Sequence, residues 1–285
     1  MAAAFIHYFL GVGLAYLFGY SGLEALVVGL LGAIQDLDFI SFLLYGRIMK
    51  MKYSRLLMHR GLTHTILFSI VCSAVLLFNP VFSLLIFANF ALHIFTDYVT
   101  AWGVSPFLPF SDKRYTLGLM TIFDIPLIIL SVCVAGAGFF SVSPLWFFAA
   151  FFGYICLRFV LKKQLHHNGL VPMGNFEYAF CYPENDYRVG KVDILGREEV
   201  IYVKKHESDI DVTVLDKIRS KIEGSMLSHF VEYPVYAIEG DSIRIKDARS
   251  YLFPGSNSFG FTLFFDQVSE QLYVLAAGRK MEIPS

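Results

Sequence analysis

The chain has 285 residues, of which 56% are hydrophobic, with a formal net charge of −1 and a mean hydropathy of +0.57. This composition is too apolar for one ordinary soluble domain, and the length is sufficient for two domains. The weak net charge, without a basic stripe interleaved with aromatic residues, argues against nucleic-acid binding. Its four cysteines are widely scattered and predict neither a disulfide framework nor a CxxC metal site. We therefore predict a membrane protein with an attached soluble part.

Long apolar runs dominate the first 163 residues. They cover residues 3–20, 22–45, 64–79, 81–99 and 122–161, and the last is long enough for two spans with a break near residues 141–144. Because a span needs about 20 apolar residues, the short run at 64–79 is expected to dip or tilt. Residues 1–163 are predicted to form a membrane α-helical bundle of about six spans.

Positive charge is confined to alternate loops between these runs. The turns near residues 19–23, 79–80 and 141–144 contain no Lys or Arg. The opposite side contains Arg47, Lys50, Lys52, Arg55, Arg60, Lys113, Arg114, Arg158, Lys162 and Lys163. The positive-inside rule then places the N-terminus, the basic loops and the C-terminal domain in the cytoplasm. The pattern predicts a multi-pass protein of the cell membrane, with the lipid bilayer as its first partner.

The pattern changes from residue 164 onward. Short alternating runs such as 199–204, 242–245 and 259–265 are separated by Gly, Asp, Asn and Pro, which is typical of β-strands and turns. One helical stretch is expected at about 215–230. Residues 164–285 are predicted to form a cytoplasmic β-rich, α+β domain.

Histidines and aspartates gather at the run ends that meet the basic loops. His93 and Asp97 are one helical turn apart, so both can bind one ion. Asp36 and Asp38 are two apart, which suits two ligands only if the helix ends there. The candidate metal ligands are His7, Asp36, Asp38, His59, His64, His93, Asp97 and Asp124. Ionisable groups at the rim of a membrane domain usually face an interior site, which favours one shared centre.

Simpler interpretations remain open for some of these residues. Asp36 and Asp38 could be a helix-end pair facing water, and His7 a single ring at the interface. Asp124 could instead begin a helix, where the helix dipole stabilises a carboxylate. Arg60 could bind a phosphate through its planar fork, or be one more cytoplasmic charge.

Mixed histidine and carboxylate ligands suit divalent ions, zinc first, with manganese or iron as alternatives. The candidates are too numerous for one tetrahedral ion, so two or three ions are predicted. We assign Asp36, His64 and Arg60 to the catalytic centre.

Several motifs resemble one known family. Over about residues 1–130 the chain resembles the family of membrane-bound, predicted metal-dependent hydrolases, some of whose bacterial members are LexA-regulated. Gln35 replaces the proline that this family usually has before its paired aspartates. The motifs are His7, Gln35-Asp36-Leu37-Asp38, His59-Arg60-Gly61-Leu62-Thr63-His64, Leu92 to Asp97, Thr100 to Val104, Pro109-Phe110-Ser111 and Phe123-Asp124. Distant similarity of this family to zinc-dependent phospholipase C, a helical fold with three metal ions, implies phosphoester hydrolysis.

Two functions follow as hypotheses. The first is an integral-membrane metal-dependent hydrolase acting on a phosphoester, such as a phospholipid head group, at the cytoplasmic face. The second is a non-enzymatic metal-binding membrane sensor or transporter. A transporter should have polar residues deep in several spans, and Ser69, Ser73, Ser83 and Asn89 are modest candidates for such a pathway.

Overall fold

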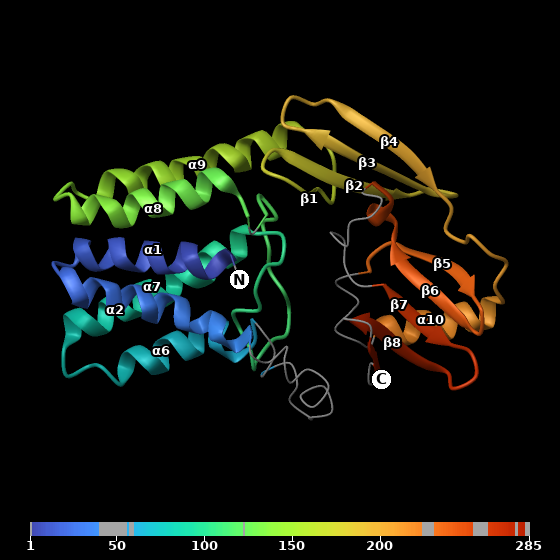
Figure 1. Ribbon diagram of the computed structural model, residues 1–285, viewed down its shortest axis with the longest axis horizontal. Coiled ribbons are helices and arrows are strands. Elements are labelled where there is room, and N and C mark those ends of the chain that lie inside the picture. Colours follow the sequence, from blue (N-terminus) through green and yellow to red (C-terminus); the bar gives the residue numbers. More distant parts are fainter. Residues whose placement is uncertain are drawn as a thin grey trace. The chain divides into compact units, whose positions relative to one another are not determined.

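A computed structural model describes residues 2–39, 56, 60–121, 123–223, 231–252, 262–276 and 279–282. The chain divides into two compact units. The first contains residues 1–166 and 171–176, and the second contains residues 167–170 and 177–285. The first unit is helical and the second is β-rich, as the sequence predicts (Figure 1).

The first unit is a bundle of helices that run alongside one another (Figure 1). Helix α1 packs against α2, α7 and α8, while α6 packs on α7 and α8 on α9. The elements are α1 (Ala2–Leu17), α2 (Gly22–Ala33), the 3₁₀ helices η1 (Ile34–Phe39) and η2 (Leu62–His64), α6 (Ile66–Ala74), α7 (Pro80–Val99), α8 (Ile125–Phe139), α9 (Leu145–Gln164) and the short strand β1 (Val171–Pro172).

The described structure does not support six spans. Helices α7 and α9, with 20 residues each, are the described helices whose length and apolar composition fit a membrane crossing. The others are shorter: α1 has 16 residues, α2 has 12, α6 has 9 and α8 has 15. At 1.5 Å per residue, α6 extends only about 14 Å, less than half of the hydrocarbon thickness. The helical half therefore contains two candidate spans.

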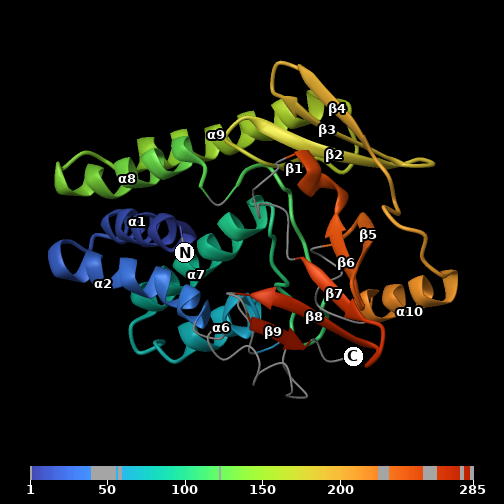
Figure 2. The same cartoon turned by 45° about the vertical axis from the view of Figure 1, so that its right-hand side comes forward.

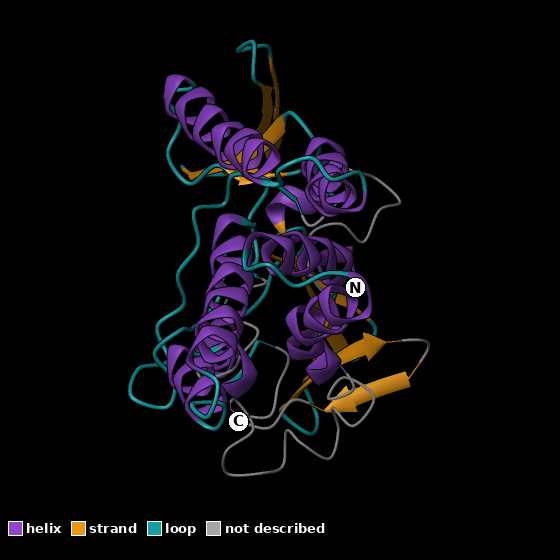
Figure 3. Cartoon of the chain, turned by 90° about the vertical axis from the view of Figure 1, so that its left-hand side faces the viewer, coloured by secondary structure: helices purple, strands orange, loops and turns teal. Residues whose placement is uncertain are grey.

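Local sequence explains where these helices begin and end. Pro80 starts α7 after Asn79, whose side chain accepts the Phe82 amide, and Thr65 caps α6 in the same way. The apolar run at 122–161 is broken into α8 and α9 by the turn at 140–144, as predicted. Figure 3 views the bundle from the end where this turn and those after α1 and α6 lie.

The second unit contains two antiparallel sheets. Strands β2 (Glu177–Pro183), β3 (Tyr187–Asp193) and β4 (Glu198–Val203) pair in that order. The other sheet has the order β5-β6-β7-β8-β9, and Figure 2 shows β9 beside β8. Its strands are β5 (Pro234–Glu239), β6 (Ser242–Asp247), β7 (Leu263–Asp266), β8 (Gln271–Ala276) and β9 (Arg279–Glu282), with helix α10 (Val212–Glu223) before them and 3₁₀ helix η4 (Ala248–Leu252) after β6.

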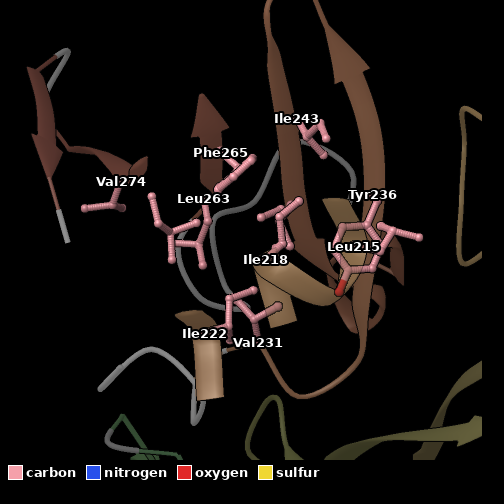
Figure 4. Packing of buried hydrophobic residues seen from close by; sticks show 11 residues of the cluster. Leu215, Ile218, Ile222, Val231, Tyr236, Ile243, Leu263, Phe265 and Val274 are labelled. Carbon is pink, nitrogen blue, oxygen red and sulfur yellow. The ribbon is translucent and has the colours of Figure 1, made fainter. Parts of the chain in front are cut away.

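Helix α10 supplies one side of the core of the five-stranded sheet. Its Leu215 and Ile218 pack with Tyr236, Ile243 and other buried strand residues (Figure 4). Alternation in β6, where Ile243 and Ile245 are buried between partly exposed neighbours, matches a strand with one face on a core.

Candidate metal centre

Five candidate ligands from four elements converge at one end of the bundle. His7 comes from α1, Asp36 from η1, His64 from η2, and His93 and Asp97 from α7. Their side chains are 0–9% exposed. They form two overlapping groups that could each hold an ion: His7, Asp36 and His93, and His64, His93 and Asp97.

Each of the three imidazoles has a partner for its Nδ1 atom. His93 Nδ1 lies 2.7 Å from the Gly32 carbonyl, His7 Nδ1 lies 3.0 Å from the Thr96 hydroxyl, and His64 Nδ1 lies 3.1 Å from Asp38 Oδ2. Such outer hydrogen bonds fix the orientation and tautomer of metal-binding histidines. All three Nε2 atoms therefore face the centre.

The hydrogen-bond network also assigns the tautomers of two rings. A carbonyl can only accept, so His93 Nδ1 carries the proton and its Nε2 carries a lone pair. Thr96 has one hydroxyl proton, which goes to a backbone carbonyl of α7, so the hydroxyl accepts from His7 Nδ1. The Nε2 atoms of His7 and His93 are thus the ones directed toward the centre.

The spacing of the inward atoms suits a single ion. His64 Nε2 lies 3.1 Å from His93 Nε2, 3.3 Å from Asp97 Oδ2 and 3.6 Å from Asp36 Oδ1. Asp36 and Asp97 each lie 3.7 Å from His7 Nε2. Tetrahedral ligands about 2.1 Å from zinc are about 3.4 Å apart. The observed separations bracket that value.

Several side-chain atoms at the centre of these ligands lack hydrogen-bond partners among the described residues. His7 Nε2, Asp36 Oδ2 and Asp97 Oδ2 are buried and have no hydrogen-bond partner among the described residues. Leaving such atoms unpaired costs about 1–3 kcal/mol each, and more for charged groups. A cation bound between them would satisfy all three, so the residues fit a divalent metal ion.

A close approach of α2 to α7 positions His93. A Cβ atom on Gly32 would lie 2.7 Å from Asn89 Oδ1, so only glycine fits there without displacement. Asn89 Nδ2 in turn donates to the Val28 carbonyl over 2.8 Å. This contact brings the Gly32 carbonyl within reach of His93.

Asp38 has a different place from Asp36. Its Oδ2 accepts from the Thr63 hydroxyl (2.5 Å) and the Arg60 amide (3.1 Å), besides contacting His64. In a 3₁₀ helix, residues two apart point about 240° from each other, so the two aspartates cannot both face the centre. The structure places Asp38 behind His64, where we expected a direct ligand.

Arg60 contacts the candidate ligand Asp97. Its Nη2 donates to Asp97 Oδ1 over 2.7 Å and its Nη1 to the Gly103 carbonyl over 2.8 Å. Gly103 adopts a φ of +60°, and a Cβ there would collide with the Tyr115 carbonyl. The Nη2 atom thus orients Asp97, while the buried Nε has no hydrogen-bond partner among the described residues, and the phosphate contact stays a prediction.

Asp124 does not join the converging residues. Its Oδ2 accepts from Arg158 over 2.8 Å, and its Oδ1 accepts from the Tyr154 hydroxyl (2.8 Å) and the Leu127 amide (3.1 Å). Asp124 is the N-cap of α8, which was the simpler interpretation of its position. Both oxygens have other partners, and the metal-ligand role of Asp124 stays a prediction. His59 lies outside the described residues.

Sequence reasoning missed the residues that support the ligands. The Gln35 amide donates to the Thr63 carbonyl over 2.6 Å and so joins η1 to η2, in place of a proline that would have lacked this bond. Thr96 and Thr63 likewise act through their hydroxyl groups, which contact His7 and Asp38 respectively. For Thr96, the one indication in the sequence was its position between the candidate ligands His93 and Asp97.

Two of the converging ligands outside the candidate spans have altered pKa values. Burial alone would raise the pKa of Asp36, but contacts with His64, His7 and His93 outweigh it and lower the pKa to about 2. Burial alone would lower the pKa of His64, but the carboxylates of Asp36, Asp38 and Asp97 raise it to about 9. Without metal, His64 therefore carries a proton on Nε2, which faces His93 Nε2 and Asp97.

This proton predicts a pH-dependent metal affinity. A metal ion at His64 Nε2 must displace it, and because the pKa of His64 is about 9, the proton competes throughout the neutral range. We expect the dissociation constant for zinc to fall at least about tenfold per pH unit between pH 6 and 8. Equilibrium dialysis at fixed ionic strength measures it. A constant affinity across this range would contradict protonation of His64.

Comparison with known proteins identifies the family of the chain. Residues 1–165 match the family described as YdjM inner membrane protein. A relative, the uncharacterised protein YfhP of Bacillus subtilis (strain 168), is 32% identical over 127 residues, covering 38% of this chain and 38% of that protein. The chain therefore matches well under two thirds of that relative. No solved structure matches. The family match includes all five converging ligands, and the chain belongs to the YdjM inner membrane protein family.

Proposed function

We propose that the chain is an integral-membrane metal-dependent hydrolase that cleaves a phosphoester. The observation that carries this proposal is the set of three imidazole Nε2 atoms and two carboxylates, three of whose inward atoms are buried without hydrogen bonds. A purely structural cluster would be expected to satisfy those atoms internally. Clusters of this kind with mixed His and Asp donors are typical of catalytic divalent metal sites.

Zinc is the ion that we propose, because neutral imidazoles and carboxylates at this spacing suit it. His93 belongs to both overlapping groups and its Nε2 binds one ion at a time, so the described ligands provide for one ion, held by one group or the other. The second and third ions expected from the sequence would need donors beyond these, with His59 as the first candidate. Manganese or iron would use the same donor set.

The chemistry assigns a role to each group around the ion. When bound, a divalent ion polarises a phosphoryl oxygen and makes a neighbouring water more acidic. Asp36, at 9% the most exposed of the five ligand side chains, would accept the proton of the attacking water. The water oxygen bonds to phosphorus, the bond from phosphorus to the leaving alcohol breaks, and the alkoxide takes up the proton. Arg60 keeps Asp97 in position throughout.

A lipid head group is the substrate that the location favours. His93 and Asp97 lie in the last two turns of candidate span α7. Lys162 and Lys163 are in the last turn of candidate span α9. If basic residues stay in the cytoplasm, this helix end and the second unit are cytoplasmic. The proposed site then lies at the depth of the phosphates of the inner leaflet.

A transport function is less well supported. Ser69, Ser73 and Ser83, the modest polar candidates along α6 and α7, each donate to a backbone carbonyl. Asn89 does so as well. Each of these four thus forms a hydrogen bond to the backbone, which suits a role in helix packing. A metal sensor remains the alternative, and it would bind metal without turnover.

Metal content and turnover of the same preparation test the proposal. We expect detergent-purified protein to contain at least one equivalent of zinc and to hydrolyse the soluble diester bis(p-nitrophenyl) phosphate. A chelator should abolish turnover, and added zinc should restore it. Bound zinc with no hydrolysis of any phosphoester would favour the sensor, and protein that binds no divalent metal would refute both.

A further inference from the structure

An apolar groove of about 520 Å³ lies beside the metal centre. Its walls include Ile66 of α6, Phe87 and Ala91 of α7, and Phe107 and Tyr115 of the following segment. The lining is almost entirely apolar, and the volume falls within the range of small-ligand sites. The groove belongs wholly to the first unit.

The groove and the metal centre share their walls. Lining residues Ile94 and Tyr98 directly follow the ligands His93 and Asp97 on α7. Val104, another lining residue, follows Gly103, whose carbonyl accepts from Arg60. Ile66 lies two residues after His64. The segments that carry the proposed ligands therefore also form walls of the groove.

The groove extends from the metal end toward the start of α7. Its lining residues on this helix run from Tyr98 back to Phe87, which corresponds to about 16 Å of helix. Because α7 is a candidate span with the ligands near its C-terminal end, this direction leads from the proposed head-group level into the bilayer. Such a path suits a hydrocarbon chain attached to a polar head at the ion.

Arg114 is a second cationic side chain, after Arg60, near the end of the groove next to the metal centre. Arg114 precedes Tyr115, which pairs with Val104 in the groove wall. The Tyr115 carbonyl lies against Gly103, whose own carbonyl accepts from Arg60. Among the described residues, the Arg114 guanidinium forms no hydrogen bond or ion pair, unlike that of Arg60. An arginine in this state beside a metal site fits a phosphate.

We propose that the groove binds the hydrocarbon chain of a membrane phospholipid whose phosphate lies between the metal centre and Arg114. This inference rests on the proposed function for the placement of the phosphate, and it adds where the chain lies and which cation binds the head. Burial of each methylene then contributes to affinity, and Arg114 contributes equally for every chain length.

The test is a series of alkyl phosphates from methyl to octyl phosphate, titrated calorimetrically into the zinc-loaded full-length protein in detergent. For wild type we expect affinity to rise about three- to fourfold per methylene. Ala91→Trp should fill the groove and remove this dependence while methyl phosphate binding persists. Arg114→Gln should weaken all members by about tenfold or more and leave the dependence on length unchanged.

The matched control is Ala150→Trp, which adds the same side chain at an exposed alanine of α9 and should behave as wild type. If Ala91→Trp loses zinc or does not fold, Ala91→Leu takes its place and should flatten the dependence in part. An unchanged dependence in a zinc-loaded Ala91 variant overturns the groove proposal, as does a failure of every alkyl phosphate to bind. Because binding is measured, a protein that shows the expected dependence without turnover supports the groove and refutes the hydrolase.

Discussion

His93→Asn is expected to lower zinc affinity by at least about a hundredfold and to abolish phosphodiester hydrolysis. His93 Nε2 belongs to both candidate ion-binding groups and lies 3.7 Å from Asp36 and 3.8 Å from Asp97. Loss of a supporting residue around a metal typically costs 10–100-fold in affinity, and loss of a shared ligand should cost more. Zinc content after dialysis against a graded chelator measures the effect.

The control for this variant is His166→Asn. His166 is exposed and has a φ of +53°, a conformation that asparagine tolerates well, so the substitution should not disturb the backbone. It should retain the wild-type zinc content and turnover. Full zinc occupancy in His93→Asn would show that the five residues converge for another reason, and the metal centre would have to be abandoned.

Features of the fold and the site were predictable where they depend on the type of a residue and its position relative to nearby residues. His64, His93 and Asp97 stand at run ends, and the one-turn spacing of the last two brings both to the same face of α7. The break between α8 and α9 and the strands of the second unit were also predictable from turn residues and alternation. These features depend on neighbours close in sequence.

Other features depend on contacts between distant segments, which one sequence does not show. The acceptor for His93 is a carbonyl at Gly32, and any residue has a carbonyl. Asp38 points away from the converging ligands because residues 34–39 form a 3₁₀ helix. The short α6 was unexpected because the apolar run continues to residue 79, while the helix ends at Ala74 and turns follow.

Arg158→Met is expected to destabilise the first unit by about 3–5 kcal/mol, because it removes one partner of a buried ion pair. Arg158 and Asp124 are both 0% exposed, and their closest N to O distance is 2.8 Å. Arg158 also donates to the carbonyls of Leu119 and Asn175, so it joins α9 to two other segments. The control is Lys163→Met, which removes an exposed cation from the same helix and should change stability by less than about 0.5 kcal/mol.

A substitution in the Arg158–Asp124 ion pair also tests whether Asp124 is a structural residue or a metal ligand. As the partner of Arg158 and the cap of α8, Asp124 should be replaceable by asparagine with a loss of stability but no loss of zinc. The thermal unfolding midpoint of Asp124→Asn in detergent, read beside its zinc content at a temperature where it is folded, separates stability from ligation. Since the amide keeps one oxygen to cap Leu127, we expect a smaller destabilisation than for Arg158→Met. A folded Asp124→Asn protein without zinc would restore Asp124 as a ligand and would mean that the ion lies closer to α8 than the converging histidines indicate.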